Sequence, residues 1–370
     1  MSIRRIAGAF LFLAFAACNH SGTAPTVASS VGPSGTGSDV QLTFNVDQDY
    51  WPAWTEDAHG ILYGFVRPGS ANHRCLGLLP AAGGTRRWQM CDDRTSQDDT
   101  VSSFGAYALR SDGRLLYTEA VSPASAASTP ERITLWLADS AAPFNRTELL
   151  TMPTFIGGAA LGWLSDIAWT GDNAFVALGQ QLSFLAHCFG CTALDTLFAD
   201  SGYVVTGTIA GGKATLHVVD GTLDATSYSL AQAGSSIVFT RKNDVHLFAV
   251  PVTGGAPVVV GTVTDAGGSQ LLGVSCAGDT CVVAVDAVSL SDPDLPSFPR
   301  LGSGPRELRS VSLTSGQAEV LRTVPSLFAT PRIAPDGHDV VAQVGGNWGH
   351  LQTFAGSGDA TLFLYRALVP

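Results

Sequence analysis

The sequence predicts an all-β fold, and three observations carry this prediction. Helical hydrophobic periodicity is nearly absent after residue 40. Short runs rich in Val, Ile, Leu, Phe, Tyr and Thr recur instead, and Gly, Asp and Pro separate these runs. A unit of strand, polar turn and second strand then repeats along the chain, which indicates a repeat architecture.

Six copies of this unit are recognisable, with turns spaced roughly 45–60 residues apart. Asp-Gly and related pairs supply the positive φ that a tight hairpin demands, so each copy is expected to be a hairpin. The spacing is that of propeller blades with generous loops, and it predicts a single β-propeller with six blades. The copies are residues 54–65, 109–118, 168–177, 230–239, 274–283 and 333–342.

Two further segments bear on the blade count and on closure of the ring. A weaker hairpin pattern, residues 204–219, lies only about 20 residues before the next turn and is interpreted as an inserted hairpin or a truncated blade. Seven blades therefore stay open as an alternative. The last copy ends in a third strand near residues 360–368, whereas residues 40–46 form a strand without a partner. Pairing these two segments would close the ring and remove an open sheet edge.

One turn carries a family signature. The sequence Pro-Arg-Ile-Ala-Pro-Asp-Gly at residues 331–337 resembles the Pro-x-x-Ser-Pro-Asp-Gly turn of TolB-type, WD40-like propeller repeats. The turn at residues 111–113 (Ser-Asp-Gly) is a partial copy, and the other copies are degenerate. The resemblance covers most of residues 40–370. It implies a propeller, often with six blades, and often a protein-binding role in the bacterial envelope.

Residues 1–17 have the features of a secretory signal peptide. Two arginines precede an apolar run that is too short to span a bilayer as a mature helix, and small residues follow it. Residues 15–18 (Phe-Ala-Ala-Cys) resemble the lipobox of bacterial lipoproteins. The resemblance implies that Cys18 carries the lipid and becomes the first mature residue. The alternative is an ordinary signal peptide with an incidental cysteine.

The remaining chain divides into a tether and a domain. Residues 18–38 are rich in Ser, Thr, Gly and Pro with almost no charge, so we expect a flexible tether. Residues 39–370 are expected to form the propeller domain. The predicted location is the cell envelope, with the lipid anchored in a bacterial membrane, the outer membrane being favoured, and the domain facing the periplasm or the exterior.

The cysteines other than Cys18 number six and fall into three local pairs, which is typical of an oxidising compartment. The expected disulfides are Cys75 with Cys91, Cys188 with Cys191, and Cys276 with Cys281. The last pair flanks a tight turn, so its thiols are expected to face each other across a hairpin. For the Cys188-Phe-Gly-Cys191 motif a structural turn disulfide is favoured, and metal binding through His187 and the two thiols is the alternative.

Charge and motifs narrow the function classes. The net charge of −11 argues against nucleic acid as a partner. No glycine-rich phosphate loop, His-Glu-x-x-His or Gly-x-Ser-x-Gly motif occurs, and no cofactor is expected. Carboxylates at residues 47–49, 92–99 and 292–294 are candidate calcium ligands, although acids in loops are usually just solvated. The seven tryptophans are expected to pack between blades, and an aromatic rim for a peptide or glycan is the alternative.

The favoured hypothesis is a non-catalytic, lipid-anchored envelope protein, expected to be a monomer, that binds an envelope protein or polysaccharide through loops on one propeller face. The rival hypothesis is a propeller enzyme, such as a lyase or glycoside hydrolase, that uses acids and an arginine in the central channel. A third alternative is a spacer that binds nothing specific. Convergence of two carboxylates and a basic group on one pocket would favour the enzyme.

Overall fold

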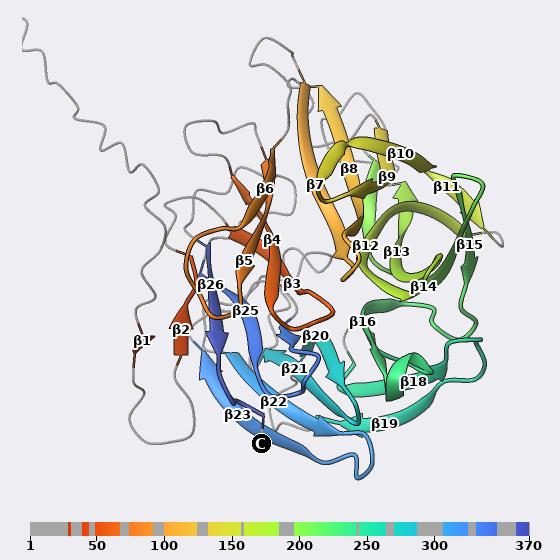
Figure 1. Cartoon of the computed structure of the whole chain (residues 1–370). Coiled ribbons are helices and arrows are strands. Elements are labelled where there is room, and N and C mark those ends of the chain that lie inside the picture. Colours follow the sequence, from red (N-terminus) through yellow and green to blue (C-terminus); the bar gives the residue numbers. More distant parts are fainter. Residues whose placement is uncertain are drawn as a thin grey trace, which may run out of the picture.

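The computed structural model describes most of the domain as antiparallel β-sheet (Figure 1). The residues described are 29–30, 39–43, 49–66, 74–91, 100–123, 132–156, 159–184, 196–241, 244–263, 270–286, 306–324, 331–345 and 360–369. Within them the one helical element is a short 3-10 turn, η2 (Gln232–Gly234). The all-β prediction is confirmed.

The strands follow one another in six groups, which we number in chain order. Group one holds β3 (Asp49–Trp54), β4 (Gly60–Val66), β5 (Arg74–Pro80) and β6 (Trp88–Cys91). Group two holds β7 (Thr100–Leu109), β8 (Arg114–Pro123), β9 (Arg132–Asp139) and β10 (Ala142–Met152). Group three holds β11 (Thr154–Ile156), β12 (Ala159–Gly171), β13 (Ala174–Phe184), β14 (Thr196–Ala210) and β15 (Lys213–Val218).

The second half of the chain repeats this order. Group four holds β16 (Ala225–Ala231), β17 (Ser236–Arg241), β18 (His246–Pro251) and β19 (Val258–Thr262). Group five holds β20 (Gln270–Ala277), β21 (Thr280–Asp286), β22 (Arg306–Ser312) and β23 (Ala318–Val324). Group six holds β24 (Arg332–Ile333), β25 (Val340–Gly345) and β26 (Ala360–Tyr365), together with the N-terminal β2 (Asp39–Gln41) and β1 (Ser29–Ser30).

Figure 1 shows these groups arranged around a common centre in chain order, as in a propeller. Groups three and four form one continuous sheet, but a single residue pair, Gly202 with Ala225, joins them. The count of six blades that the sequence predicts stays a prediction. In each group the polar turn found in the sequence connects two consecutive antiparallel strands, as between β7 and β8 or β24 and β25.

Turn chemistry explains why these hairpins form where they do. Asp112 Oδ1 accepts a hydrogen bond from the backbone N–H of Arg114 at 3.1 Å, and Gly113 has a φ of 90°. Asp336 Oδ1 likewise accepts from the N–H of His338 at 3.1 Å. Short acidic side chains that bond to their own turn favour this geometry, and glycine supplies the positive φ.

The N-terminal segment pairs with the C-terminal strand. β2 lies antiparallel to β26 in the register Asp39 with Tyr365, and Leu42 N donates to Leu362 O at 2.8 Å. This is the pairing that the closure prediction requires, over residues 39–42 rather than 40–46; residues 44–46 lie outside the described residues. Ser29–Ser30 adds β1 to the edge of β2 inside the segment expected to be a tether.

The interpretation of residues 204–219 as an inserted hairpin or truncated blade is wrong. These residues form the outer hairpin of group three, in which β14 pairs with β15 from Val205 opposite Val218 to Ala210 opposite Lys213. Because residues 185–195 separate β13 from β14, this hairpin lies close in the sequence to the next polar turn. Residues 204–219 therefore give no support for a seventh blade.

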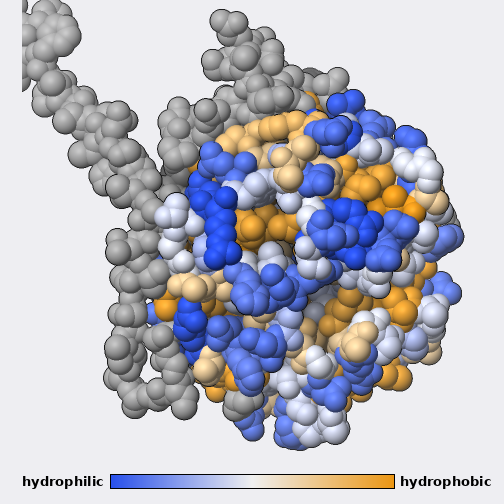
Figure 2. All heavy atoms as spheres, in the orientation of Figure 1, coloured by the Kyte–Doolittle hydropathy of each residue, from blue (hydrophilic) through white to orange (hydrophobic). Residues whose placement is uncertain are grey.

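The hydrophobic core lies between neighbouring groups rather than inside any one of them. Each of six clusters of buried side chains combines residues of two consecutive groups. One cluster joins Leu62 and Leu76 of group one to Phe104 and Leu115 of group two. Both faces of each sheet are thus covered, which explains strands such as β4 in which every residue is buried. On the face seen in Figure 2, hydrophilic and hydrophobic residues are interspersed.

Candidate functional site

A pocket of about 460 Å³ opens beside the turns that connect the inner strands to the second strands. We call it the turn-face pocket. Four consecutive groups line it, because their first turns lie next to one another around the ring. The lining residues are Glu56, Arg110, Trp169, Thr170, Gly171, Leu230, Ala233 and Gly234.

Arg110 is the most constrained charged side chain of this pocket. Its Nη1 donates to Gly171 O at 2.8 Å and its Nη2 to Asp172 Oδ1 at 2.9 Å, so it ties group two to group three. The hydrogen bond to Asp172 raises the pKa of Arg110. The guanidinium carbons of Arg110 and Arg114 lie 5.6 and 5.5 Å from the Trp169 ring centre. These distances suit cation–π contacts.

Glu56 reaches the pocket from group one. Its Oε2 accepts from the backbone N–H of Ser111 at 3.1 Å and from the Ser111 hydroxyl at 3.0 Å. The pKa values of two neighbouring acids are lowered. A backbone hydrogen bond from Arg114 lowers the pKa of Asp112, and a hydrogen bond from the Thr55 side chain lowers the pKa of Asp57. These acids are therefore held in their charged form at neutral pH.

The side of the pocket that group four supplies is a turn with unusual backbone geometry. Gln232 and Ala233 have φ values of 50° and 57°, and Gln232 N donates to Gly278 O at 3.3 Å. Gly278 lies in the turn that the Cys276–Cys281 disulfide spans. The disulfide-bonded hairpin of group five therefore supports the group-four turn.

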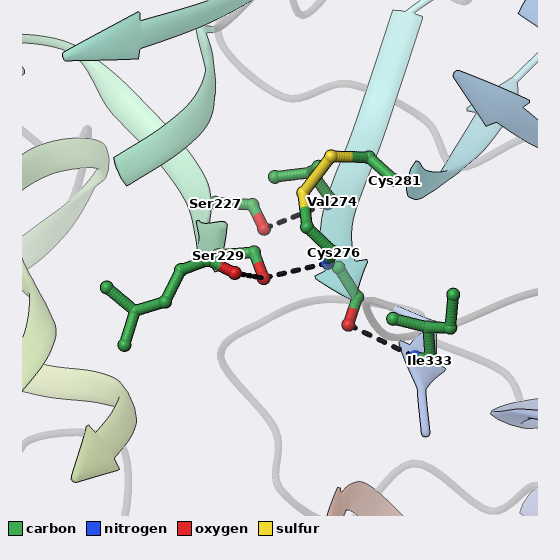
Figure 3. Close-up of a disulfide and its surroundings, with 8 residues drawn as sticks. Ser227, Ser229, Val274, Cys276, Cys281 and Ile333 are labelled. Atoms are coloured by element: carbon green, nitrogen blue, oxygen red, sulfur yellow. Dashed lines mark hydrogen bonds between the residues drawn. A yellow bond between two sulfur atoms is a disulfide. The ribbon is translucent and has the colours of Figure 1, made fainter. Parts of the chain in front are cut away.

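Figure 3 shows how the same two groups join at their inner strands. Ser227 Oγ accepts from Val274 N at 3.1 Å, and Ser229 Oγ accepts from Cys276 N at 2.8 Å. Ser275 repeats the arrangement one group later, since its Oγ accepts from Ile333 N at 3.1 Å. The inner strands do not pair with one another as a sheet, so serine hydroxyls satisfy N–H groups that a sheet neighbour would otherwise accept.

An ion pair crosses the centre of the molecule, and we call it the axial ion pair. Arg332 of β24 pairs with Asp166 of β12, which belong to the sixth and third groups, and both side chains are about one-fifth exposed at 21% and 22%. Asp166 has a φ of 52° in an irregular part of β12, and its backbone carbonyl accepts from the Tyr228 hydroxyl. The carbonyl of Arg332 accepts from Trp54 Nε1 at 2.9 Å.

Buried tyrosines surround this ion pair. Burial raises the pKa of both Tyr107 and Tyr228 well above the usual value of 10.0. The hydroxyl of Tyr107 donates to Tyr50 O at 3.0 Å, and that of Tyr228 donates to Val176 O at 2.8 Å. The tyrosines thus stay neutral and act as donors that join one group to the next.

The structure contains two of the three disulfides that the sequence predicts. Cys75–Cys91 joins β5 to β6, and Cys276–Cys281 joins β20 to β21. Cys18, Cys188 and Cys191 lie outside the described residues, as does His187. The anchor, the third disulfide and its metal-binding alternative therefore stay predictions.

The candidate calcium ligands are also largely outside the described ranges. Of the three carboxylate clusters only Asp49 is placed, and its side chain is fully buried at the start of β3. Among the residues that the structure places, no three His, Cys, Asp or Glu side chains gather in a way that could hold a metal ion.

Several tryptophans pack between groups, as expected. Trp88 Nε1 donates to Ser140 O at 2.6 Å, and Trp169 Nε1 donates to Ala108 O at 3.1 Å, each across a group boundary. Trp169 combines this role with a place in the turn-face pocket. Sequence reasoning did not single out Glu56, Arg110 or the axial ion pair; the one available signal was the pair of arginines that flanks the Ser-Asp-Gly turn at residues 111–113.

A second cavity, of about 630 Å³, lies at the outer edge between β19 and the turn joining β22 to β23. Its one charged lining residue is Arg309, which is engaged by Glu307 at 2.6 Å. In the placed part of the chain, no helix has the length and apolar character needed to cross a membrane.

No protein-family model and no curated protein matches the chain. Solved structures do. A gluconolactonase from Xanthomonas campestris has a TM-score of 0.51 at 14% identity, with 90% of each chain covered. A putative TolB from Agrobacterium tumefaciens has a TM-score of 0.47 at 13% identity, covering 88% of this chain and 91% of that one.

The β-propeller domain of Swd1 from Myceliophteria thermophila has a TM-score of 0.43 at 10% identity, covering 85% of this chain and 82% of that one. Likenesses at identities this low bear on the fold and give no information about activity. The sheet arrangement and the likeness to the gluconolactonase structure together show that the chain has a propeller-type, all-β fold.

Proposed function

We propose that the protein is an exported lipoprotein of the bacterial envelope whose propeller binds an envelope protein or polysaccharide without catalysis. The N-terminal lipid on Cys18 anchors it, with the outer membrane as the favoured site. The domain acts as a monomer and needs no cofactor.

The axial ion pair is the observation that carries this proposal. A channel enzyme of the glycosidase type needs two carboxyl groups, one of them with a raised pKa so that it can donate a proton. Among the described residues, the centre of this molecule instead holds one carboxylate, Asp166, in an ion pair with one guanidinium, Arg332, and both residues are tied to neighbouring groups. That arrangement supports a structural role for the axis.

The acids near the turn-face pocket support the same conclusion. The pKa of Asp57 and that of Asp112 are both lowered, which is opposite to what a general acid requires. Charged and aromatic side chains on adjacent turns of a rigid ring suit recognition of a ligand better than proton transfer to it.

Site-specific photo-cross-linking of the full-length protein in intact envelopes tests the binding role. The cross-linker replaces Ser111 beside the turn-face pocket and, as the matched control, Ser315 on the outer edge turn. We expect a cross-linked protein or polysaccharide from the Ser111 position in greater yield than from Ser315. Recovery of the protein without any cross-linked partner from both positions would contradict the proposal.

Two further arms separate the alternatives. A Cys18→Ser variant is expected to lose metabolic labelling with a fatty-acid analogue and to leave the membrane fraction; retained labelling would contradict the anchor. Incubation of the protein with envelope polysaccharides is expected to release no products. Product release that disappears in Asp166→Asn would establish the enzyme instead.

A further inference from the structure

We propose that the turn-face pocket binds a short neutral saccharide, with Trp169 as the wall for a sugar ring and with Glu56 and Arg110 as hydrogen-bond partners for its hydroxyl groups. The inference rests on the proposed binding function and names the ligand class and its site. The volume of the turn-face pocket, about 460 Å³, lies within the range of about 300–1,000 Å³ typical of small-ligand pockets.

The apolar side of the pocket comes from Trp169 and Leu230. The indole N–H of Trp169 is already bound to Ala108 O, so the side chain is held in place where it lines the pocket. Leu230 is half-buried and lies on the neighbouring group. Sugar rings have faces of C–H groups, which pack on aromatic and aliphatic surfaces while their hydroxyls point sideways.

The polar side of the pocket retains hydrogen-bonding capacity. Glu56 uses Oε2 for both bonds to Ser111, which leaves Oε1 as an acceptor because an ionised carboxylate has about four acceptor sites. Arg110 donates one bond from each terminal nitrogen to Gly171 and Asp172, although a guanidinium carries five N–H groups. Thr170 adds an exposed hydroxyl-bearing side chain.

Charge selects a neutral ligand. The pocket lining contains one anion, Glu56, and one cation, Arg110. An anionic ligand would also meet Asp112 and Asp172 nearby, and a cationic ligand would meet Arg114 beside Trp169. A neutral hydroxylated ligand avoids both repulsions and gains hydrogen bonds to charged partners, which are stronger than neutral ones.

The group-four side of the pocket is held in advance of binding. The turn from Gln232 to Gly234 keeps positive φ values and bonds to Gly278 inside the hairpin that Cys276 and Cys281 close. A site whose shape exists before the ligand arrives loses less entropy on binding. Opening this disulfide is therefore expected to weaken binding.

The test uses detergent-solubilised full-length lipoprotein and isothermal titration with defined probes. Neutral probes are cellotriose, maltotriose and tri-N-acetylchitotriose; trigalacturonate is the anionic probe and trilysine the cationic one. We expect at least one neutral trisaccharide to bind and to change tryptophan fluorescence. Binding of trigalacturonate or trilysine in place of every neutral probe would overturn the inference, as would no binding of any probe.

Variants assign the binding to this pocket. Glu56→Gln keeps an oxygen for Ser111 and removes the charge, and we expect about a tenfold loss of affinity because a charge-assisted bond becomes a neutral one. Trp169→Ala is expected to lose at least as much. The matched control, Thr314→Ala in the outer-edge cavity, is expected to leave affinity unchanged. Because Glu56 is exposed, Glu56→Gln is expected to leave the fold intact. Unchanged affinity in this variant would therefore place the ligand elsewhere.

A disulfide arm tests the supporting hairpin. The double variant of Cys276 and Cys281 to alanine is expected to bind several-fold more weakly, while that of Cys75 and Cys91, which lies away from the pocket, keeps its affinity. Equal affinities in both would refute the supporting role. If envelope cross-linking captures a partner but no neutral saccharide binds, this inference alone fails; if neither succeeds, the proposed function fails as well.

Discussion

Replacing Ser227 by alanine tests how the inner strands are held together. Ser227 is 1% exposed and Val274 is fully buried, and the serine Oγ accepts the Val274 N–H at 3.1 Å. In Ser227→Ala the Val274 N–H loses this acceptor in a place where water does not reach. Leaving a buried donor unsatisfied costs about 1–3 kcal/mol, so we expect the free energy of unfolding to fall by that amount.

Ser229→Ala is the matched control on the same strand. Ser229 and Cys276 are only partly buried, so water can replace the lost hydroxyl and the expected cost is about 1 kcal/mol or less. Equilibrium urea unfolding measures both variants, with the m-value unchanged if the folded state is intact. A loss in Ser229→Ala as large as that in Ser227→Ala would refute the reasoning, because burial would not then decide the cost.

Three further predictions follow from packing, cross-linking and charge. A Cβ on Gly207 would lie 2.2 Å from Cζ of the fully buried Phe175, so Gly207→Ala should cost about 1–3 kcal/mol in urea unfolding. Removing both cysteines of the Cys75–Cys91 disulfide, which are 16 residues apart, should cost about 3 kcal/mol because the unfolded chain gains freedom; an unchanged midpoint would contradict this. Because the folded pKa of Asp57 lies below 3.8, its contribution is present above pH 3.8 and is lost as the pH falls through the folded value, so Asp57→Asn should reduce the loss of stability in acid.

Much of the fold could be predicted from local sequence because turn chemistry is local. Asp112 with Gly113 and Asp336 with Gly337 specify tight turns within a few residues, and an unpartnered N-terminal strand pointed to β26. The third group escaped this reasoning for the opposite reason. The long stretch 185–195 separates its two hairpins, so residues 204–219 did not have the spacing of the other copies.

The candidate site could be predicted only in part, because it forms from residues distant in the chain. Asp166 and Arg332 meet at the centre through the ring arrangement and not through any sequence spacing. Glu56 and Arg110 gather beside Trp169 because successive turns lie next to one another. The disulfides at residues 75 and 91 and at 276 and 281 were accessible because each joins adjacent strands of one group.

Hydrogen exchange at the Leu42 amide is the most direct test of the account, since it reports whether the segment containing β2 pairs with β26. The N–H of Leu42 donates to Leu362 O at 2.8 Å, and the Leu42 side chain is buried between groups six and one. The account predicts that this amide exchanges only when the whole domain unfolds, as core strands do. Exchange at the rate of a free peptide would show that the chain termini do not meet, and it would contradict the ring.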